Sequence, residues 1–182
     1  MKKISTPLTK EKIFGLEAGD QVLLSGTLLT ARDAAHKKMI EYIERGEKIP
    51  FELKGQVIYY TGPCPAKPGM IIGSAGPTTS GRMDKYTPRL LDIGLAGMIG
   101  KGDRSKEVAQ SIIKNQCAYF GAIGGAGALI AKSIIHQKII AWPELGTEAV
   151  RELEVVDMPV IVLIDFEGNN LYKTGRERYR RL

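Results

Sequence analysis

The sequence predicts an α/β fold with a largely parallel sheet, because short apolar segments alternate with helix-like segments along the chain. Apolar residues make up 43% of the 182 residues and charged residues 25%, which is ordinary for a globular protein. A chain of this length buries roughly 70% of its unfolded surface. We find neither an internal repeat nor a long linker, so we expect a single domain over residues 1–182.

The first half of the chain begins the alternation. Residues 21–30 are strand-like and run into a helix in which Ala35, Met39 and Ile43 fall at helical spacing, with Gly46 ending it. Further strands are expected at 56–63 and 69–77, followed by a helix at 83–97 with a kink or second start at Pro88.

The second half continues the same pattern. The expected elements are a short strand and turn at 97–102, a helix at 105–115, a strand at 118–123, a glycine-rich turn feeding a helix at 124–133, and strands at 133–142 and 150–168.

The positive charge is concentrated at the C-terminus. Residues 171–182 carry five cations against one glutamate, so four of the six net positive charges lie there. Tyr172 and Tyr179 lie among these cations, so this segment could bind nucleic-acid phosphates. A solvated basic tail, or one that docks on an acidic partner surface, is the favoured interpretation because nothing else in the chain builds a nucleic-acid face.

The cysteine content points to a reducing, cytoplasmic setting, because only Cys64 and Cys117 are present. Two cysteines and two histidines, all far apart, give no zinc pattern and cannot hold an iron–sulfur cluster by themselves. We expect no signal peptide in the first residues and no membrane span, since no apolar run approaches ~20 residues.

Three strand-to-helix junctions combine cations with hydroxyl or glycine residues. Thr30 and Asp33 form a capping-box pattern that places Arg32 in the first turn of a helix. The segment 78–82 (TTSGR) supplies hydroxyls, a glycine and an arginine, and the segment 100–103 (GKGD) holds a lysine between two glycines.

Such junctions meet at the carboxyl edge of a parallel sheet, where ligands bind and helix N-termini attract anions. The pattern therefore predicts a site for a molecule with two anionic groups. Each residue also has a plainer interpretation: Arg32 pairs with Glu41 or Asp33, the threonines only cap a helix, and Arg82 lies over the sheet edge. A purely structural role is harder to assign to Lys101, because glycines on both sides weaken a strand and usually signal a close approach of the backbone.

Two other features attract functional interpretations. His36 lies one turn after Arg32 and could act as an acid or base, but a solvated helix histidine is the interpretation that we rank first. The glycine cluster at 121–128 fails the spacing of a dinucleotide fingerprint, and no phosphate-binding P-loop motif occurs. Close helix packing, or a backbone wall of the pocket, explains the cluster better.

Five of these segments, in this order, make the chain resemble the C-terminal half of class I fumarases. That half is a separate beta subunit in two-subunit fumarases and L-tartrate dehydratases, and the match runs from about residue 15 to residue 168. The segments are GTLLTARDAAHKKM, YYTGPCPA, GPTTSGRMD, GKGD and AYFGAIGGAGAL.

The resemblance implies a swivelling β/β/α domain, in which a sheet with helices is backed by a second, smaller sheet. It implies an enzyme that reversibly adds water to fumarate, or removes it from malate or tartrate. The family's [4Fe–4S] cluster is held by three cysteines of the alpha half, so the resemblance also implies a hetero-oligomer with an iron–sulfur alpha subunit.

The resemblance also assigns roles to four residues. Arg32 matches an arginine that binds a substrate carboxylate, Arg82 the arginine that clamps a carboxylate, and Lys101 a substrate-binding lysine. Thr78 matches a threonine proposed as the catalytic base. Fumarase ranks first and L-tartrate dehydratase second; the alternative from another class is a stand-alone anion- or nucleotide-binding module.

Overall fold

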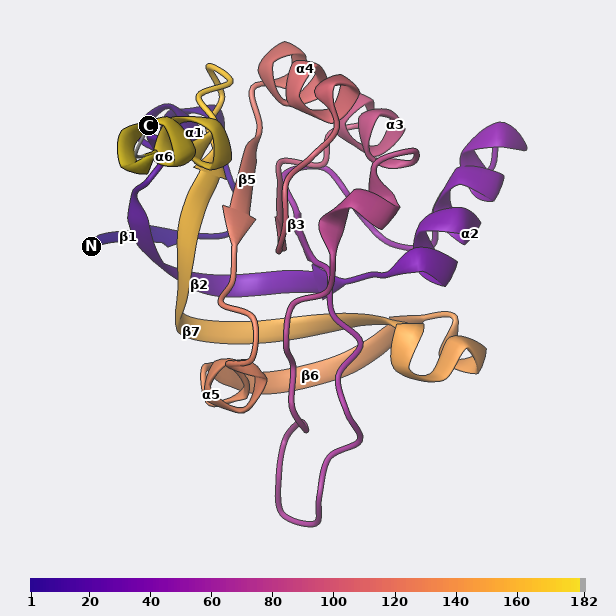
Figure 1. Cartoon of the computed structure of the whole chain (residues 1–182). Helices are drawn as coiled ribbons and strands as arrows, with labels where there is room; N and C mark the ends of the chain where they lie inside the picture. The colour runs from indigo at the N-terminus through magenta and orange to yellow at the C-terminus, as the bar shows by residue number, and fades with distance from the viewer. Residues whose placement is uncertain (181–182) are drawn as a thin grey trace.

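Seven strands form one mixed sheet in the computed structural model, which describes residues 1–180 (Figure 1). The strands are β1 (Lys2–Ser5), β2 (Gln21–Thr30), β3 (Val57–Tyr59), β4 (Gly97–Gly100), β5 (Ala118–Gly121), β6 (Ile134–Ala141) and β7 (Val150–Ile164). The helices are α1 (Lys10–Phe14), α2 (Asp33–Glu44), α3 (Thr87–Asp92), α4 (Lys106–Asn115), α5 (Gly127–Ala131) and α6 (Leu171–Tyr179), with 3₁₀ helices η1 (Ser80–Met83) and η2 (Pro143–Glu148).

The strands β1 to β5 lie in chain order, and each is parallel to its neighbour. Parallel neighbours need crossover connections, and α2, α3 and α4 supply those between β2 and β5. The predicted α/β class with a mostly parallel sheet is therefore confirmed.

Strand β7 closes the sheet. It runs antiparallel to β2 over most of its length, pairs with β6 on its other side, and pairs with β5 between Ile161 and Ile164. Because β7 joins both β2 and β5, the run from β2 to β5 curls round and the sheet meets itself (Figure 1). The second, smaller sheet that we expected is this antiparallel layer of β2, β7 and β6, which is continuous with the parallel strands.

Alternation along the strands divides the core into two clusters. Val57 and Tyr59 of β3 face the cluster inside the closed sheet, whereas Ile58 and Tyr60 face the cluster under the helices. Met39 of α2 belongs to the second cluster. The layers are thus sheet, sheet and helices, which is the β/β/α order implied by the resemblance.

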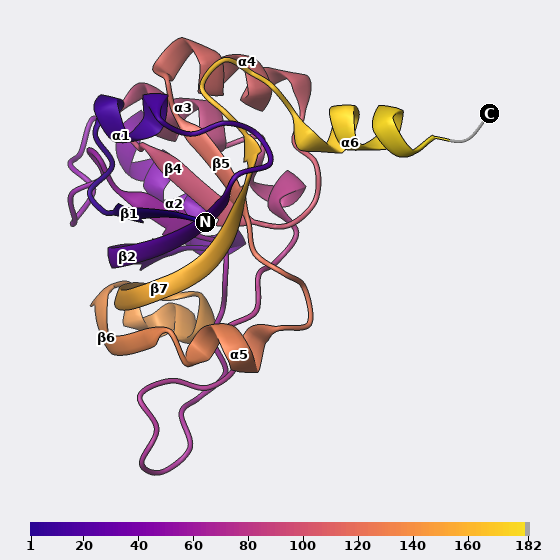
Figure 2. The same ribbon diagram turned by 90° about the vertical axis from the view of Figure 1, so that its left-hand side faces the viewer.

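The strand expected at 69–77 is wrong. Residues 62–75 instead form a loop that projects at the bottom of Figures 1 and 2 and closes on itself, with Cys64 N–H donating to Ser74 O. Pro65 and Pro68 cannot donate to a sheet, and the apolar Met70 is left exposed.

The two ends of the chain carry elements that the sequence pattern did not reveal. The N-terminus forms edge strand β1 and the short helix α1. The segment interpreted as a basic tail contains α6, which projects from the body of the molecule in Figure 2. Within the described residues, no helix has both the length and the apolar character needed to cross a membrane.

Candidate functional site

The three predicted junctions lie at the carboxyl ends of parallel strands. Arg32 follows β2 as the N-cap of α2, and Lys101 follows β4. Residues 78–80 lie between the ends of β3 and β4: Thr78 N–H donates to Tyr60 O, Lys101 N–H to Thr78 O and Ser80 N–H to Lys101 O. The edge of the sheet thus holds all three junctions, at the carboxyl ends of parallel strands where α/β proteins bind ligands.

One carboxylate joins the two arginines. Asp33 Oδ2 lies 3.2 Å from Arg82 Nη2 and 3.8 Å from Arg32 Nη2. Asp33 stands in the first turn of α2, where a negative charge is also favoured by the helix dipole. The sequence interpretation gave Asp33 only a capping role, whereas the structure makes it the link between two predicted binding residues.

A second carboxylate, Glu148 at the end of η2, reaches the same place. Its Oε2 accepts from Ala34 N–H at 2.7 Å and its Oε1 lies 3.6 Å from Arg32 Nη2. The Arg32 side chain also lies against Gly62, where a Cβ would be only 2.9 Å from Nη1. The residue pattern gave no signal for Glu148, because its partners lie far away in the sequence.

The capping box predicted for α2 is wrong. Thr30 Oγ1 donates to Ala149 O and accepts from Arg151 N–H, so it ties β2 to β7 rather than capping the helix. The free Ala34 N–H in the first turn is satisfied by Glu148 instead.

Thr78 is fixed through the end of β3. Its backbone N–H and its Oγ1 both donate to Tyr60 O, at 2.8 and 2.9 Å. Its side chain is partly exposed and does not cap a helix, and neither does that of Thr79 at the start of η1. The hydroxyl of Thr78 is thus oriented by a carbonyl, which fixes its oxygen at the end of β3.

Lys101 presents its ammonium group to solvent. The aliphatic chain passes Gly124, and the structure describes no ion pair to Lys101 within residues 1–180. The flanking Gly100 is required by a close approach, since a Cβ there would collide with Ser80 Oγ. The glycine signal in the sequence thus reflects the crossing of η1 over the end of β4.

His36 is buried, and the expectation of a solvated histidine is wrong. Its Nδ1 lies 2.8 Å from Arg32 O, which makes Nδ1–H the donor. Burial lowers the pKa of His36 to about 4, and the nearby Arg104 charge acts in the same direction. The ring is therefore neutral near pH 7 and holds the backbone from which Arg32 extends.

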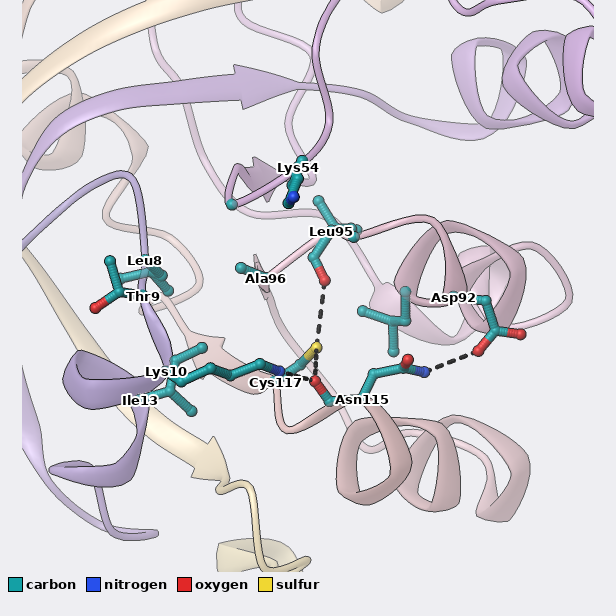
Figure 3. Close-up of a pocket in the computed structure, with 13 residues that line it drawn as sticks. Leu8, Thr9, Lys10, Ile13, Lys54, Asp92, Leu95, Ala96, Asn115 and Cys117 are labelled. Carbon is teal, nitrogen blue, oxygen red and sulfur yellow. Dashed lines mark hydrogen bonds between the residues drawn. The ribbon is translucent and has the colours of Figure 1, made fainter.

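Two hollows border this region and the far end of the sheet. Asp33 and Arg82 line an open hollow of about 790 Å³ beside η1. A smaller one of about 310 Å³, shown in Figure 3, lies near the amino ends of β4 and β5 and includes Ala96 and Cys117. None of the four predicted binding residues lines the smaller hollow, and Arg82 is the one of the four that lines the open hollow beside η1.

The part of the chain that the structure describes does not bring together the ligands of an iron–sulfur cluster. Among residues 1–180, no three His, Cys, Asp or Glu side chains lie together as a metal site would require. Cys64 is exposed on the projecting loop, whereas Cys117 is buried with its thiol donating to Leu95 O at 3.2 Å. Burial raises the pKa of Cys117 to about 11, so its thiolate is disfavoured.

The arrangement of the cluster suits a dianion. Arg32, Arg82 and the N-terminus of α2 lie together at this edge of the sheet, where Asp33 and Glu148 contact the arginines, and Lys101 follows the strand β4. Arginine binds a carboxylate through two parallel hydrogen bonds, while lysine adds a point charge. Such a cluster can bind the two carboxylates of a small molecule and stabilise extra negative charge on one of them.

Comparison with known proteins gives a consistent result. Residues 2–175 match the model of the family described as Fumarase C-terminus. Fumarate hydratase 2 of Leishmania major is 41% identical over 165 residues, covering 90% of this chain and 29% of that relative. The anaerobic class I fumarate hydratase of Escherichia coli is 39% identical over 175 residues, covering 95% of this chain and 31% of that relative.

A third relative has nearly the same length as this chain. The putative L(+)-tartrate dehydratase subunit beta of Methanocaldococcus jannaschii is 37% identical over 182 residues, covering 96% of this chain and 93% of that relative. The chain thus spans about a third of the length of the fumarate hydratases and nearly all of the dehydratase subunit.

Proposed function

The chain belongs to the fumarase C-terminus family, and from this membership we propose that it supplies the carboxylate-binding half of a hydro-lyase active site. The reaction proposed first is the reversible hydration of fumarate to malate. The observation that carries the proposal is the cluster in which Arg32 and Arg82 share Asp33 beside Thr78 and the unpaired Lys101 of the described chain.

The chemistry explains why cations gather here. In the dehydration direction, a proton leaves the carbon next to a carboxylate, and the electron pair of that C–H bond spreads into the carboxylate. Fixed cations aimed at this carboxylate stabilise the transition state more than the ground state. We assign Arg82 and Arg32 to the carboxylates and Lys101 to a further substrate oxygen.

Thr78 is the residue that we propose to take the proton. A neutral threonine hydroxyl does not hold a second proton near pH 7, so Thr78 would act as an alkoxide: its own proton is lost to solvent before water is excluded from the site, and the surrounding cations stabilise the negative oxygen. Its attachment to Tyr60 O fixes the hydroxyl oxygen at the strand end. Lys101 is held beside it, because Lys101 N–H donates to Thr78 O and Lys101 pairs with Thr79 in a parallel bridge.

We further propose a partner for this chain. The [4Fe–4S] cluster implied by the resemblance would be held by a cysteine-bearing alpha subunit, since the side chains described in this chain do not gather as its ligands. The chain would then be one domain, residues 1–182, of a cytoplasmic hetero-oligomer whose active site lies between the two subunits. The fumarate hydratases, in which the matching part is about a third of a longer protein, support this arrangement.

The second candidate activity is the dehydration of L-tartrate. It is favoured by the relative of matching length, which is named as a dehydratase subunit beta. Both substrates carry two carboxylates, so the same cluster serves either of them. A stand-alone anion- or nucleotide-binding module is the alternative from another class.

Anaerobic affinity purification of this chain from its native cells tests the proposal. We expect a cysteine-bearing iron–sulfur partner to co-purify, and the eluate to hydrate fumarate or dehydrate tartrate. A lone, colourless and inactive chain that binds a nucleotide tightly in isothermal titration would contradict the proposal and support the binding module.

A further inference from the structure

A buried arginine lies directly beneath the candidate site. The side chain of Arg104 is 0% exposed and its Nε donates to Asp84 Oδ1 at 2.7 Å. Its Nη2 donates to Thr87 Oγ1 at 2.9 Å. Burial alone would lower the pKa of Arg104, but Tyr60 and Asp84 outweigh it and raise that pKa, so the charge is permanent.

The partners of Arg104 connect the two segments that carry the site cations. Asp84 lies two positions after Arg82, and Arg104 three positions after Lys101. The second oxygen of Asp84 accepts from Ser105 N–H at 2.6 Å. One carboxylate therefore binds both a side chain and a backbone group of the β4–α4 connection, and this fixes the separation of the two segments.

Two tyrosines complete this buried cluster. The guanidinium lies 5.4 Å from the ring of Tyr60 and 4.9 Å from that of Tyr119. The hydroxyl of Tyr119 lies 2.8 Å from Ser80 Oγ and 2.7 Å from Gly102 O. It therefore also joins η1 to the lysine loop, the segment 101–105 that connects β4 to α4. The carbonyl of Tyr60 in turn holds Thr78.

Stability alone does not account for a charge in this position. Desolvation offsets most of the attraction within a buried ion pair, and well-packed apolar residues often replace such pairs without loss. What an apolar replacement cannot supply is direction, because Arg104 donates to Asp84 and Thr87 along fixed lines.

We propose that Arg104 is a positioning residue that sets the separation between Arg82 and Lys101 in the site. This inference rests on the proposed function, since those two cations are there assigned to the substrate. Arg104 does not touch substrate in this proposal. It acts through Asp84 on η1 and through its own backbone on the lysine loop.

The test compares Arg104→Lys with wild type in the complex reconstituted with the cysteine-bearing partner. Lysine keeps the charge and loses the second donor direction. We expect kcat/KM for the dicarboxylate to fall about tenfold, with most of the loss in kcat, because displaced cations lose contacts that strengthen in the transition state. Arg89→Lys, an exposed arginine of α3, is the matched control and should behave as wild type.

Amide hydrogen exchange supplies a readout that needs no activity. In Arg104→Lys, exchange in 79–85 and 101–105 should quicken by roughly tenfold, with β7 unchanged. Asp84→Asn should give the same pattern and serves if the first variant folds poorly. Uniform acceleration along the chain, or unchanged kcat/KM and unchanged local exchange, would overturn the proposal. A wild-type complex without hydro-lyase activity would contradict the proposed function. Amide hydrogen exchange in 79–85 and 101–105 would still test the positioning role of Arg104.

Discussion

Arg32 and Arg82 carry like charges at one edge of the sheet, and Asp33 lies between them. The carboxylate is 3.2 Å from Arg82 and 3.8 Å from Arg32, while Glu148 adds a second contact to Arg32. Mutual repulsion between the guanidinium groups is thus offset within the chain. The arginines are held near one another before a substrate arrives, which is the preorganisation that electrostatic catalysis needs.

Replacement of Arg82 separates function from stability. We expect Arg82→Ala to lower kcat/KM of the reconstituted enzyme by about 10² to 10³, because a carboxylate contact that strengthens in the transition state is lost. The free energy of unfolding should change by less than about 1 kcal/mol, since the Arg82 side chain is 47% exposed. Steady-state kinetics measures kcat/KM and urea denaturation the free energy of unfolding, with Arg89→Ala as the control. Near-normal activity of Arg82→Ala would exclude Arg82 from the site.

The buried His36 predicts a pH dependence of stability. Its pKa is about 4 in the folded chain and about 6.5 when unfolded, so the unfolded state binds more protons between these values. The stabilisation is complete above pH 6.5 and is lost as pH falls from 6.5 to 4, amounting to about 3 kcal/mol.

Urea unfolding between pH 7 and 5 tests this dependence. The free energy of unfolding of the wild type should fall with pH, and His36→Asn should flatten the slope. His136→Asn, at an exposed position of β6, should keep the wild-type slope. Equal slopes in wild type and His36→Asn would show that His36 is protonated alike in both states.

At the scale of elements, the start of α6 supports the loop that carries Lys101. Gly102 N–H donates to Tyr172 Oη at 3.0 Å, and Asn170 Nδ2 donates to Asp103 Oδ1 at 3.1 Å. Asn170 also caps α6 by accepting from Tyr172 N–H. The C-terminal segment is therefore joined to the candidate site at its first turn, although the rest of α6 projects outward (Figure 2).

Loss of the Tyr172 hydroxyl should loosen this loop. Tyr172→Phe removes the acceptor of Gly102 N–H, so we expect the free energy of unfolding to fall by about 1 kcal/mol. KM of the reconstituted enzyme should rise about threefold, because Lys101 lies one residue away. Thermal denaturation and kinetics measure these changes, and Lys173→Ala, exposed on the same helix, is the control. An unchanged KM would mean that the loop keeps its place without α6.

At the scale of the whole molecule, β7 holds the two layers together. It pairs with β2, β5 and β6, so opening either core cluster requires breaking its contacts. Cys117 lies immediately before β5 and is buried, whereas Cys64 lies on the loop that projects from the body. The reactivity of Cys117 therefore reports opening of the sheet, whereas Cys64 is accessible in the native chain.

Alkylation of the two thiols should show one slow and one fast site. Cys64 should react at once in the native chain, while Cys117 should react only when the sheet opens, because burial raises its pKa to about 11. Mass spectrometry across a urea gradient follows both rates, with Cys64→Ser isolating the buried thiol. Similar rates for both thiols without urea would mean that β5 opens independently of the rest.

Much of the architecture follows from local sequence. The strand expected at 56–63 forms as β3 (Val57–Tyr59), and the helix expected at 105–115 forms as α4, which Ser105 caps. Gly100 beside Lys101 correctly signals a close approach, which is that of Ser80, whereas Gly102 adopts a positive φ of 86°. The apolar run 69–77 misled because Pro68 precedes it and its backbone closes on Cys64, so that it stays outside the sheet.

The sequence by itself determined which residue types stand at each strand end, because strand, turn and helix propensities act over a few neighbouring positions. Only the tertiary structure decided how those residues are joined. Glu148 meets Ala34 across 114 positions, Arg104 meets Asp84 across 20, and His36 is buried against Tyr60 and Tyr86. Such partners have no local signal, since the closing of the sheet by β7 and the packing of the helices bring them together.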